Sequence, residues 1–191
     1  MAALYGYEPV RCVRTMSGQG IPIQMRLPED ELNTFPAGTP VTIASGYVQE
    51  SAFGGSELVL GIAAEAAHNL AVDGTAEELS IGDPPNQSSG VIIPVGSPIK
   101  DGKLAVYIAN SQNVFRAKLK VDQTFASSLI SATRYELKKD GTTLSWYIDT
   151  SSSGTNDEHC VNIIGQDPST PNTAGYVAVF FVFAPAARFY D

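Results

Sequence analysis

The chain is poor in the residues from which catalytic and metal sites are built. It has two histidines and two cysteines, and charged residues make up 17% of its 191 residues, against roughly 25% in an average globular protein. No apolar run approaches the length of about 20 residues that a membrane-spanning helix needs, so we expect no membrane partner. The opening residues, MAALYGYEP, lack the basic and then apolar order of a signal peptide, which predicts synthesis and retention in a cytoplasm.

Basic residues are also scarce. The chain has 12 Lys and Arg against 20 Asp and Glu, a net charge of −8 at pH 7. Proteins bind nucleic acid largely through Lys and Arg that displace counterions from phosphates, so we expect no nucleic-acid partner. Three arginines, Arg11, Arg14 and Arg26, nevertheless fall near the N-terminus. An acidic body suits a protein that is displayed densely on a surface and must stay soluble.

Catalytic motifs are lacking as well. The chain has no Gly-x-Ser-x-Gly elbow, Walker loop, dinucleotide fingerprint or CxxC pair. His68 lies among small residues, and His159 directly precedes Cys160, so on a strand these two side chains point to opposite faces and rarely share a metal ion. We therefore predict no enzymatic activity, no cofactor and no metal site. For Cys12 and Cys160 we expect free, mostly buried thiols, because a chain of this size needs no disulfide.

The sequence does have many short runs of alternating apolar and polar residues between turns, with 17 Gly and 12 Pro. Asp140-Gly141 predicts a hairpin in which Trp146 belongs to the core, and the segment 122–132 is the one predicted helix. The most apolar run, 176–183, predicts a central strand buried on both faces. The other runs predict strands at 21–27, 40–48, 57–63, 104–108, 113–121, 135–138, 144–148 and 160–164.

These elements predict a mainly β fold, a β-sandwich or barrel-like body with one short helix and an N-terminal arm. We expect the arm at 1–20, a small β subdomain at 21–75, a loop at 76–90 and a main β domain at 91–191, with the helix near 122–132. Whether the two halves are separate domains stays open, and no internal repeat is evident in the sequence.

Both ends of the chain carry apolar and aromatic side chains, which at a terminus are usually docked or used for contact. The candidate contact residues are Leu4, Tyr5, Tyr7, Arg11, Arg14, Phe189 and Tyr190. A rival function is a carbohydrate- or ligand-binding β module of a fibre or adhesin, in which Trp146, Tyr147 and Tyr135 form a stacking platform. A buried Trp146 would argue against that function.

Several short motifs resemble a known family. Residues 37–41 (AGTPV), 46–48 (GYV) and 60–66 (LGIAAEA) resemble the small β domains of head decoration proteins of tailed bacteriophages, in which a Gly-x-Pro-Val strand entry is followed by a Gly-Ile-Ala strand end. Residues 93–95, 106–110 and 114–117 resemble virion structural proteins of the same kind. The resemblance covers about the middle third of the chain.

The resemblance implies a non-enzymatic capsid decoration (cement) protein that is made in the host cytoplasm and located in the virion. Such a protein binds the outer surface of an assembled capsid, bridges neighbouring copies of the major capsid protein and stabilises the shell against the pressure of its DNA. It also implies a homo-oligomer, with a trimer favoured.

Overall fold

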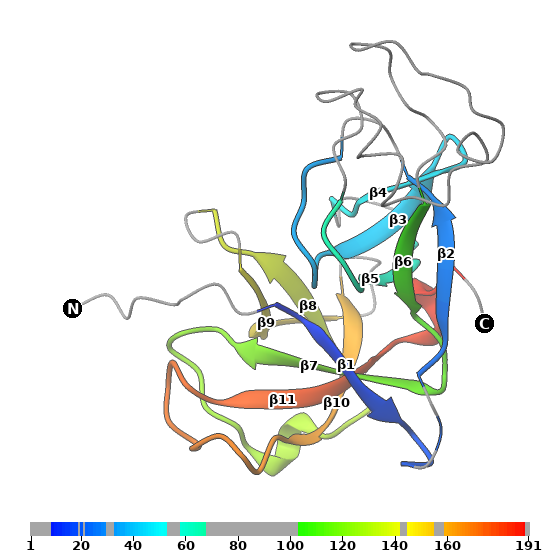
Figure 1. The fold of residues 1–191 in the computed structure, drawn as a ribbon. Coiled ribbons are helices and arrows are strands. Elements are labelled where there is room, and N and C mark those ends of the chain that lie inside the picture. The colour runs from blue at the N-terminus through cyan, green and yellow to red at the C-terminus, as the bar shows by residue number, and fades with distance from the viewer. Residues whose placement is uncertain are drawn as a thin grey trace, which may run out of the picture.

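The computed structural model describes residues 9–18, 20, 22–29, 33–52, 58–67, 103–141, 145–154 and 159–189, and it confirms a mainly β fold (Figure 1). No helix in these ranges is long and apolar enough to cross a membrane. The strands are β1 (Arg11–Thr15), β2 (Gln24–Pro28), β3 (Pro40–Ala44), β4 (Tyr47–Glu50), β5 (Gly61–Ala63), β6 (Lys103–Ile108), β7 (Asn113–Leu119), β8 (Arg134–Lys139), β9 (Trp146–Gly154), β10 (His159–Gln166) and β11 (Ala178–Phe183). Two 3₁₀ turns, η2 (Ser127–Leu129) and η3 (Pro185–Ala187), are the helical elements of the described residues.

Strands β7 to β11 form a closed five-stranded barrel, the C-terminal barrel. The order around it is β7-β11-β10-β8-β9, with antiparallel neighbours throughout. A parallel pairing of β9 with the end of β7 closes the ring, with Lys118 opposite Tyr147 and Leu119 opposite Ile148. Strand β1 pairs antiparallel with the first half of β7 and adds a sixth strand to this sheet.

Strands β2 to β6 form a second sheet, the N-terminal unit, in the order β2-β6-β5-β3-β4. A single parallel bridge between Glu29, just after β2, and Val48 of β4 brings the last strand back to the first. When the five strands of each half are numbered in chain order, both halves read 1-5-4-2-3, and in both the first and third strands meet in parallel. The two halves therefore repeat one topology, which the sequence did not reveal.

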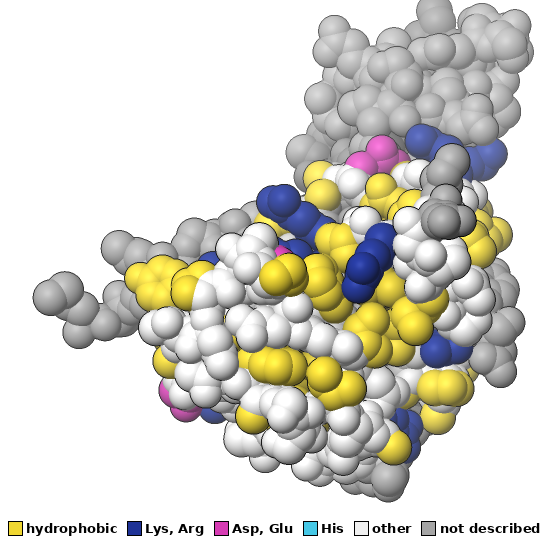
Figure 2. Space-filling model, turned by 90° about the horizontal axis from the view of Figure 1, so that it is seen from below, with side chains coloured by type: hydrophobic (Ala, Val, Ile, Leu, Met, Phe, Trp, Pro, Cys, Tyr) yellow, Lys and Arg dark blue, Asp and Glu magenta, His cyan; other side chains and the backbone are white. Residues whose placement is uncertain are grey.

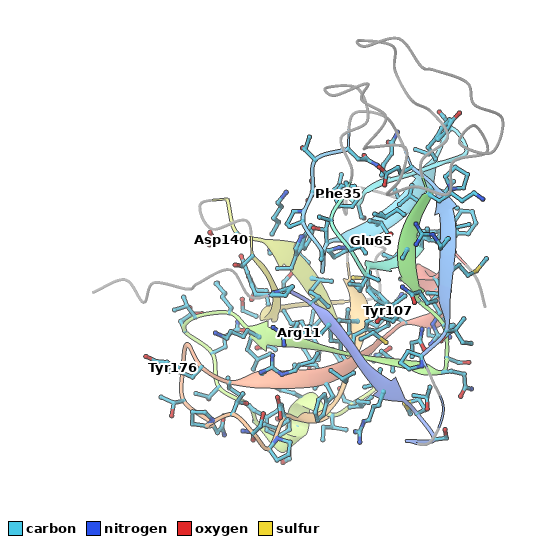
Figure 3. All side chains as sticks on the ribbon, in the orientation of Figure 1. Arg11, Phe35, Glu65, Tyr107, Asp140 and Tyr176 are labelled. Carbon is cyan, nitrogen blue, oxygen red and sulfur yellow. The ribbon has the colours of Figure 1, made fainter. Side chains whose placement is uncertain are left out.

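Each half has its own core. The N-terminal unit encloses Phe35, Val41, Val48, Leu60, Ala63, Leu104, Val106 and Ile108. The C-terminal barrel packs around Phe115, Phe181 and Phe183, whose ring centroids lie 5.2–5.7 Å apart. Ile62 and Tyr107, which are register partners on β5 and β6, belong to the barrel cluster, and Tyr107 lies between the two halves in Figure 3. The two sheets therefore pack against each other through shared apolar contacts.

The boundaries of the sheets differ from the segments expected from the sequence. Strand β6 falls within 91–191, the expected main domain, yet it pairs with β2 and β5 of the N-terminal unit. Strand β1 falls within the expected arm, yet it is a strand of the barrel sheet, in which Cys12 packs against the core. Strand β9 continues to Gly154, beyond the end of the strand predicted at 144–148.

The helix predicted at 122–132 is wrong, because the segment forms only the three-residue turn η2. Phe125 and Leu129 pack against the barrel core, whereas the side chain of Ile130 is 50% exposed. The side chain of Asn172 bonds both the backbone N–H and the backbone carbonyl of Phe125, at 2.7 and 2.9 Å. The segment therefore follows the barrel surface in an extended form instead of completing helical turns.

Candidate binding surface

One segment of the chain forms the outer edge of both sheets. Residues 11–28 run antiparallel to residues 103–116, because β1 pairs with β7 and β2 pairs with β6. We call the described residues of 11–28 the edge ribbon. Within the described chain, β1 has β7 as its one strand neighbour, and β2 has β6 and the bridge at Glu29. Figure 1 shows β1 in front of the barrel sheet and β2 along the margin of the N-terminal unit, so the ribbon spans both halves.

A buried asparagine holds the ribbon at the corner between the two sheets. The Asn113 side-chain amide donates to the carbonyls of Ile23 and Ile108 at 2.8 and 2.9 Å, and its oxygen accepts from the Ile23 N–H at 2.9 Å. The backbone N–H of Met16 also donates to the Gln112 carbonyl at 2.7 Å. This role is not evident from the sequence, because an asparagine at the start of a strand is ordinarily a turn residue.

The ribbon exposes apolar and basic side chains side by side. Its exposed apolar residues are Val13 (39% exposed), Met16 (53%), Ile23 (46%) and Met25 (39%), and its exposed basic residues are Arg11, Arg14 and Arg26. Figure 2 views the molecule from the side towards which β1 runs in Figure 1, and there hydrophobic side chains lie among Lys and Arg side chains with few acids. Met and Arg are enriched in protein–protein interfaces, whereas Asp and Glu are depleted, so this composition is typical of a protein-binding surface.

The ribbon and the strands beside it contain no acidic residue. Residues 9–28 and 103–119 hold six basic residues and no Asp or Glu, namely Arg11, Arg14, Arg26, Lys103, Arg116 and Lys118. The chain has 12 basic residues, so the remainder holds 12 − 6 = 6 of them together with all 20 acids. The net charge of −8 therefore conceals a basic strip along one edge of the protein.

Arg11 and Arg14 are the least neutralised part of this strip. Among the described residues, no acid forms an ion pair with either of them, whereas Arg116 pairs with Asp167 at 2.5 Å and Arg26 approaches Glu65 at 3.8 Å. The Arg14 guanidinium lies 5.0 Å from the centroid of the Phe180 ring, an arrangement that holds a cation in place without removing its charge. In Figure 3, Arg11 lies on the exposed strand β1.

The predicted contact residues fall into three groups. Leu4, Tyr5, Tyr7 and Tyr190 lie outside the described residues. Arg11 and Arg14 lie together on the edge ribbon, next to four apolar residues that sequence analysis missed. A stretch of 20 residues without Asp or Glu, 9–28, is the sequence signal that could have indicated this surface.

Phe189 lies beside β5 instead of on the ribbon. Its N–H donates to the Val59 carbonyl at 2.9 Å, and the Ala187 carbonyl accepts from the Val59 N–H at 2.7 Å. The Phe189 side chain remains 39% exposed, and nearby Leu58 is 40% exposed. The end of the described chain is thus docked through its backbone and leaves a small apolar patch.

Trp146, Tyr147 and Tyr135 do not form the exposed stacking platform that the rival carbohydrate-binding function requires. Trp146 and Tyr135 are each 5% exposed and belong to the barrel core. Tyr147 is half-buried, and burial raises the pKa of its hydroxyl. The hairpin prediction itself is confirmed, since Lys139 pairs with Trp146 across β8 and β9.

Neither thiol has the properties of a reactive or metal-binding group. Cys12 and Cys160 are free, as expected, and burial raises the pKa of each to about 12. Both are therefore protonated at neutral pH, and a protonated thiol is neither a nucleophile nor a metal ligand. Within the ranges that the structure describes, no three His, Cys, Asp or Glu side chains gather to hold a metal. His68, Asp157 and the side chain of His159 lie outside the described residues.

A buried charge network lies around Asp149 on the outer face of β8 and β9. The Asp149 carboxylate accepts hydrogen bonds from Gln123 and Ser151 at 2.8 and 2.5 Å, and Lys120 and Lys138 lie 3.5 and 3.8 Å away. Burial by itself raises the pKa of Asp149, but the hydrogen bonds and the Lys120 charge outweigh it and lower the pKa to about 2. A carboxylate held so firmly in its charged form is a poor general base at neutral pH, so the network is structural.

Comparisons with family models, with curated proteins and with solved structures find no match to this chain.

Proposed function

We propose that this protein is a non-enzymatic structural protein of a virion, which binds the outer surface of an assembled phage capsid and stabilises it by bridging copies of the major capsid protein. The edge ribbon is the observation that carries the binding step. It presents four exposed apolar side chains among arginines on a rigid β framework, which is the composition of a protein interface.

The resemblance of several motifs to those of head decoration proteins supports the viral assignment. Residues 37–41 lead into β3, residues 46–48 begin β4, and residues 60–66 contain β5. The motif at 106–110 begins in β6 and the motif at 114–117 lies within β7, while the motif at 93–95 lies outside the described residues. They lie at the strand entries and ends of both halves, so the resemblance concerns the β framework that carries the ribbon.

The mechanism follows from the position of the ribbon. Because the ribbon runs along both halves, a partner that binds it contacts the N-terminal unit and the C-terminal barrel together. A shell offers many identical sites, so a modest affinity at each is sufficient, particularly when the protein binds as an oligomer. We favour a homotrimer, which sedimentation velocity of the purified protein tests directly.

Co-sedimentation with assembled heads of the source phage tests the proposal. We expect the wild-type protein to sediment with the heads and the double variant Met16→Asp, Met25→Asp to lose affinity by about tenfold or more, because both side chains lie on the ribbon. The matched control is Val121→Asp, Ile130→Asp, which changes the charge equally at residues of similar exposure, 43% and 50%, away from the ribbon.

A wild-type protein that stays in the supernatant would refute the proposal, as would equal binding by both double variants. Removing the N-terminal residues up to Thr15 is a less suitable test, because that deletion takes away β1 together with the buried Val10 and Thr15. Loss of binding would then reflect damage to the barrel sheet.

A further inference from the structure

We infer that the surface bound by the edge ribbon is an acidic protein surface with an apolar centre. This inference rests on the proposed function and names the chemistry of its partner. It starts from the charge distribution, in which Arg11 and Arg14 lie on an acid-free strip of a protein with a net charge of −8.

The two arginines are ready to pair with carboxylates of a partner. Both side chains are exposed, and neither forms an ion pair with an acid in the described part of the chain. Arg14 is already held over the Phe180 ring in the unbound protein. Binding therefore costs little further conformational entropy at this side chain. Complementary charge across an interface speeds association and selects the partner, which is the role this strip fits.

The exposed apolar residues of the edge ribbon favour a protein over a nucleic acid as the partner. Val13, Met16, Ile23 and Met25 stand 39–53% exposed along the ribbon. A phosphate backbone offers nothing to bury these side chains, whereas a protein surface removes them from water at about 25 cal/mol per Å².

The contact is made by side chains and not by addition of a strand to β1. The register of β1 shifts between Cys12 and Arg14, which marks a bulge, and Pro22 and Pro28 flank or end β2. Bulges, prolines and charged side chains are the features by which sheet edges avoid pairing with other strands. The partner therefore contacts the exposed side chains on the face of the ribbon.

The test measures binding of the full chain to assembled heads at about 0.05 M and about 0.5 M NaCl, because added salt screens exposed charges. We expect wild-type affinity to fall by about tenfold or more between these concentrations. At low salt, Arg11→Gln, Arg14→Gln should lose a similar factor and become nearly insensitive to salt. Arg11→Lys, Arg14→Lys should keep most of the salt dependence, which separates charge from packing.

The control is Arg134→Gln, Lys139→Gln, which removes two positive charges from β8 and should bind within about twofold of wild type. Thermal unfolding of every variant confirms that it is folded. If the wild type binds heads equally at both salt concentrations and the ribbon variant binds like the control, the partner surface is not acidic, although the proposed function stands.

If the wild type fails to bind heads at either salt concentration, the proposed function falls and this inference falls with it. Binding to DNA is measured separately, by fluorescence anisotropy with a duplex of about 30 base pairs at low salt, where electrostatic binding is strongest. We expect no saturable binding to DNA. Binding to DNA that is tighter than binding to heads would overturn the assignment to a protein surface.

Discussion

Replacing Asn113 with alanine tests whether one side chain fixes the edge ribbon to both halves of the molecule. The wild-type amide makes three hydrogen bonds, two of them to Ile23 and one to Ile108, at 2.8–2.9 Å. At about 1 kcal/mol for each net hydrogen bond, their loss lowers the free energy of unfolding by about 3 kcal/mol. For a chain of this size the midpoint of thermal unfolding should fall by roughly 6–12 °C.

The matched control is Asn172→Ala. Asn172 also bonds a backbone N–H and a backbone carbonyl, those of Phe125, but it lies at an exposed site where water replaces the lost partners. We expect this variant to lose less than about 1 kcal/mol. The assay is urea unfolding followed by Trp146 fluorescence, with hydrogen exchange of the Ile23 amide as a local measurement.

Asn113→Ala should accelerate exchange at Ile23 well beyond the change in global stability, because the ribbon loses its attachment at the corner. If Asn113→Ala and Asn172→Ala lose equal stability, or if Ile23 exchange is unchanged, the side chain does not hold the ribbon. The assignment of the corner to Asn113 would then be wrong.

Three further predictions concern the framework. Gly61→Ala should lower the free energy of unfolding by about 3 kcal/mol or more, because a Cβ at this position would lie 2.0 Å from the Tyr107 carbonyl oxygen. Urea unfolding measures this loss. A loss below about 1 kcal/mol would contradict the close approach of β5 to β6. Ser45 has φ 52° in the two-residue turn between β3 and β4, a left-handed conformation that glycine adopts more easily than serine. Ser45→Gly should therefore leave the free energy of unfolding unchanged or raise it by up to about 1 kcal/mol. A clear loss of stability in calorimetry would count against a left-handed turn. Asp149 has a folded pKa lowered from 3.8 to about 2, so its contribution is complete above about pH 5 and is lost as pH falls through about 2. Acid unfolding should show a steeper loss, by about 2 kcal/mol, in wild type than in Asp149→Asn, and parallel curves would refute the role of this carboxylate.

Local patterns predicted the faces of individual strands well. In β7 the alternation placed Phe115 and Leu119 inside the barrel and Lys118 outside, as observed, since successive side chains of a strand point to opposite faces. Over the predicted strand 113–121 the same alternation places Val121 on the face of Phe115 and Leu119, yet Val121 is 43% exposed. The strand ends at Leu119, and the chain turns before Val121 reaches the core.

Local sequence patterns do not predict which distant segments pair with each other. Nothing in the sequence of β1, RCVRT, indicates that it joins β7 about 100 residues later or that it belongs to the sheet of the C-terminal barrel. The repeated strand order of the two halves was equally hidden, because it lies in the connections between strands while the side chains differ. Only the three-dimensional pairing shows both features.

The candidate surface was predicted in part, through Arg11 and Arg14. The apolar residues Ile23 and Met25 were missed, because they alternate with polar neighbours, and that pattern is typical of a buried face. They lie instead on the edge ribbon with no sheet packed over them, 46% and 39% exposed. Periodicity shows that two side chains share a face, but it does not show whether that face is covered.

The pairing of β1 with β7 has a consequence for synthesis of the protein. Arg11 lies opposite Arg116, so the ribosome adds 116 − 11 = 105 residues after Arg11 before both partners are present, which takes about 5 to 20 s at 5–20 residues per second. The strands from Gln24 to Ile108 are all made within that delay, and they find their partners among themselves. Among the described strands β1 is the first to be translated and therefore among the last to be paired, and a chain that stops before Asn113 cannot complete the surface to which we assign binding.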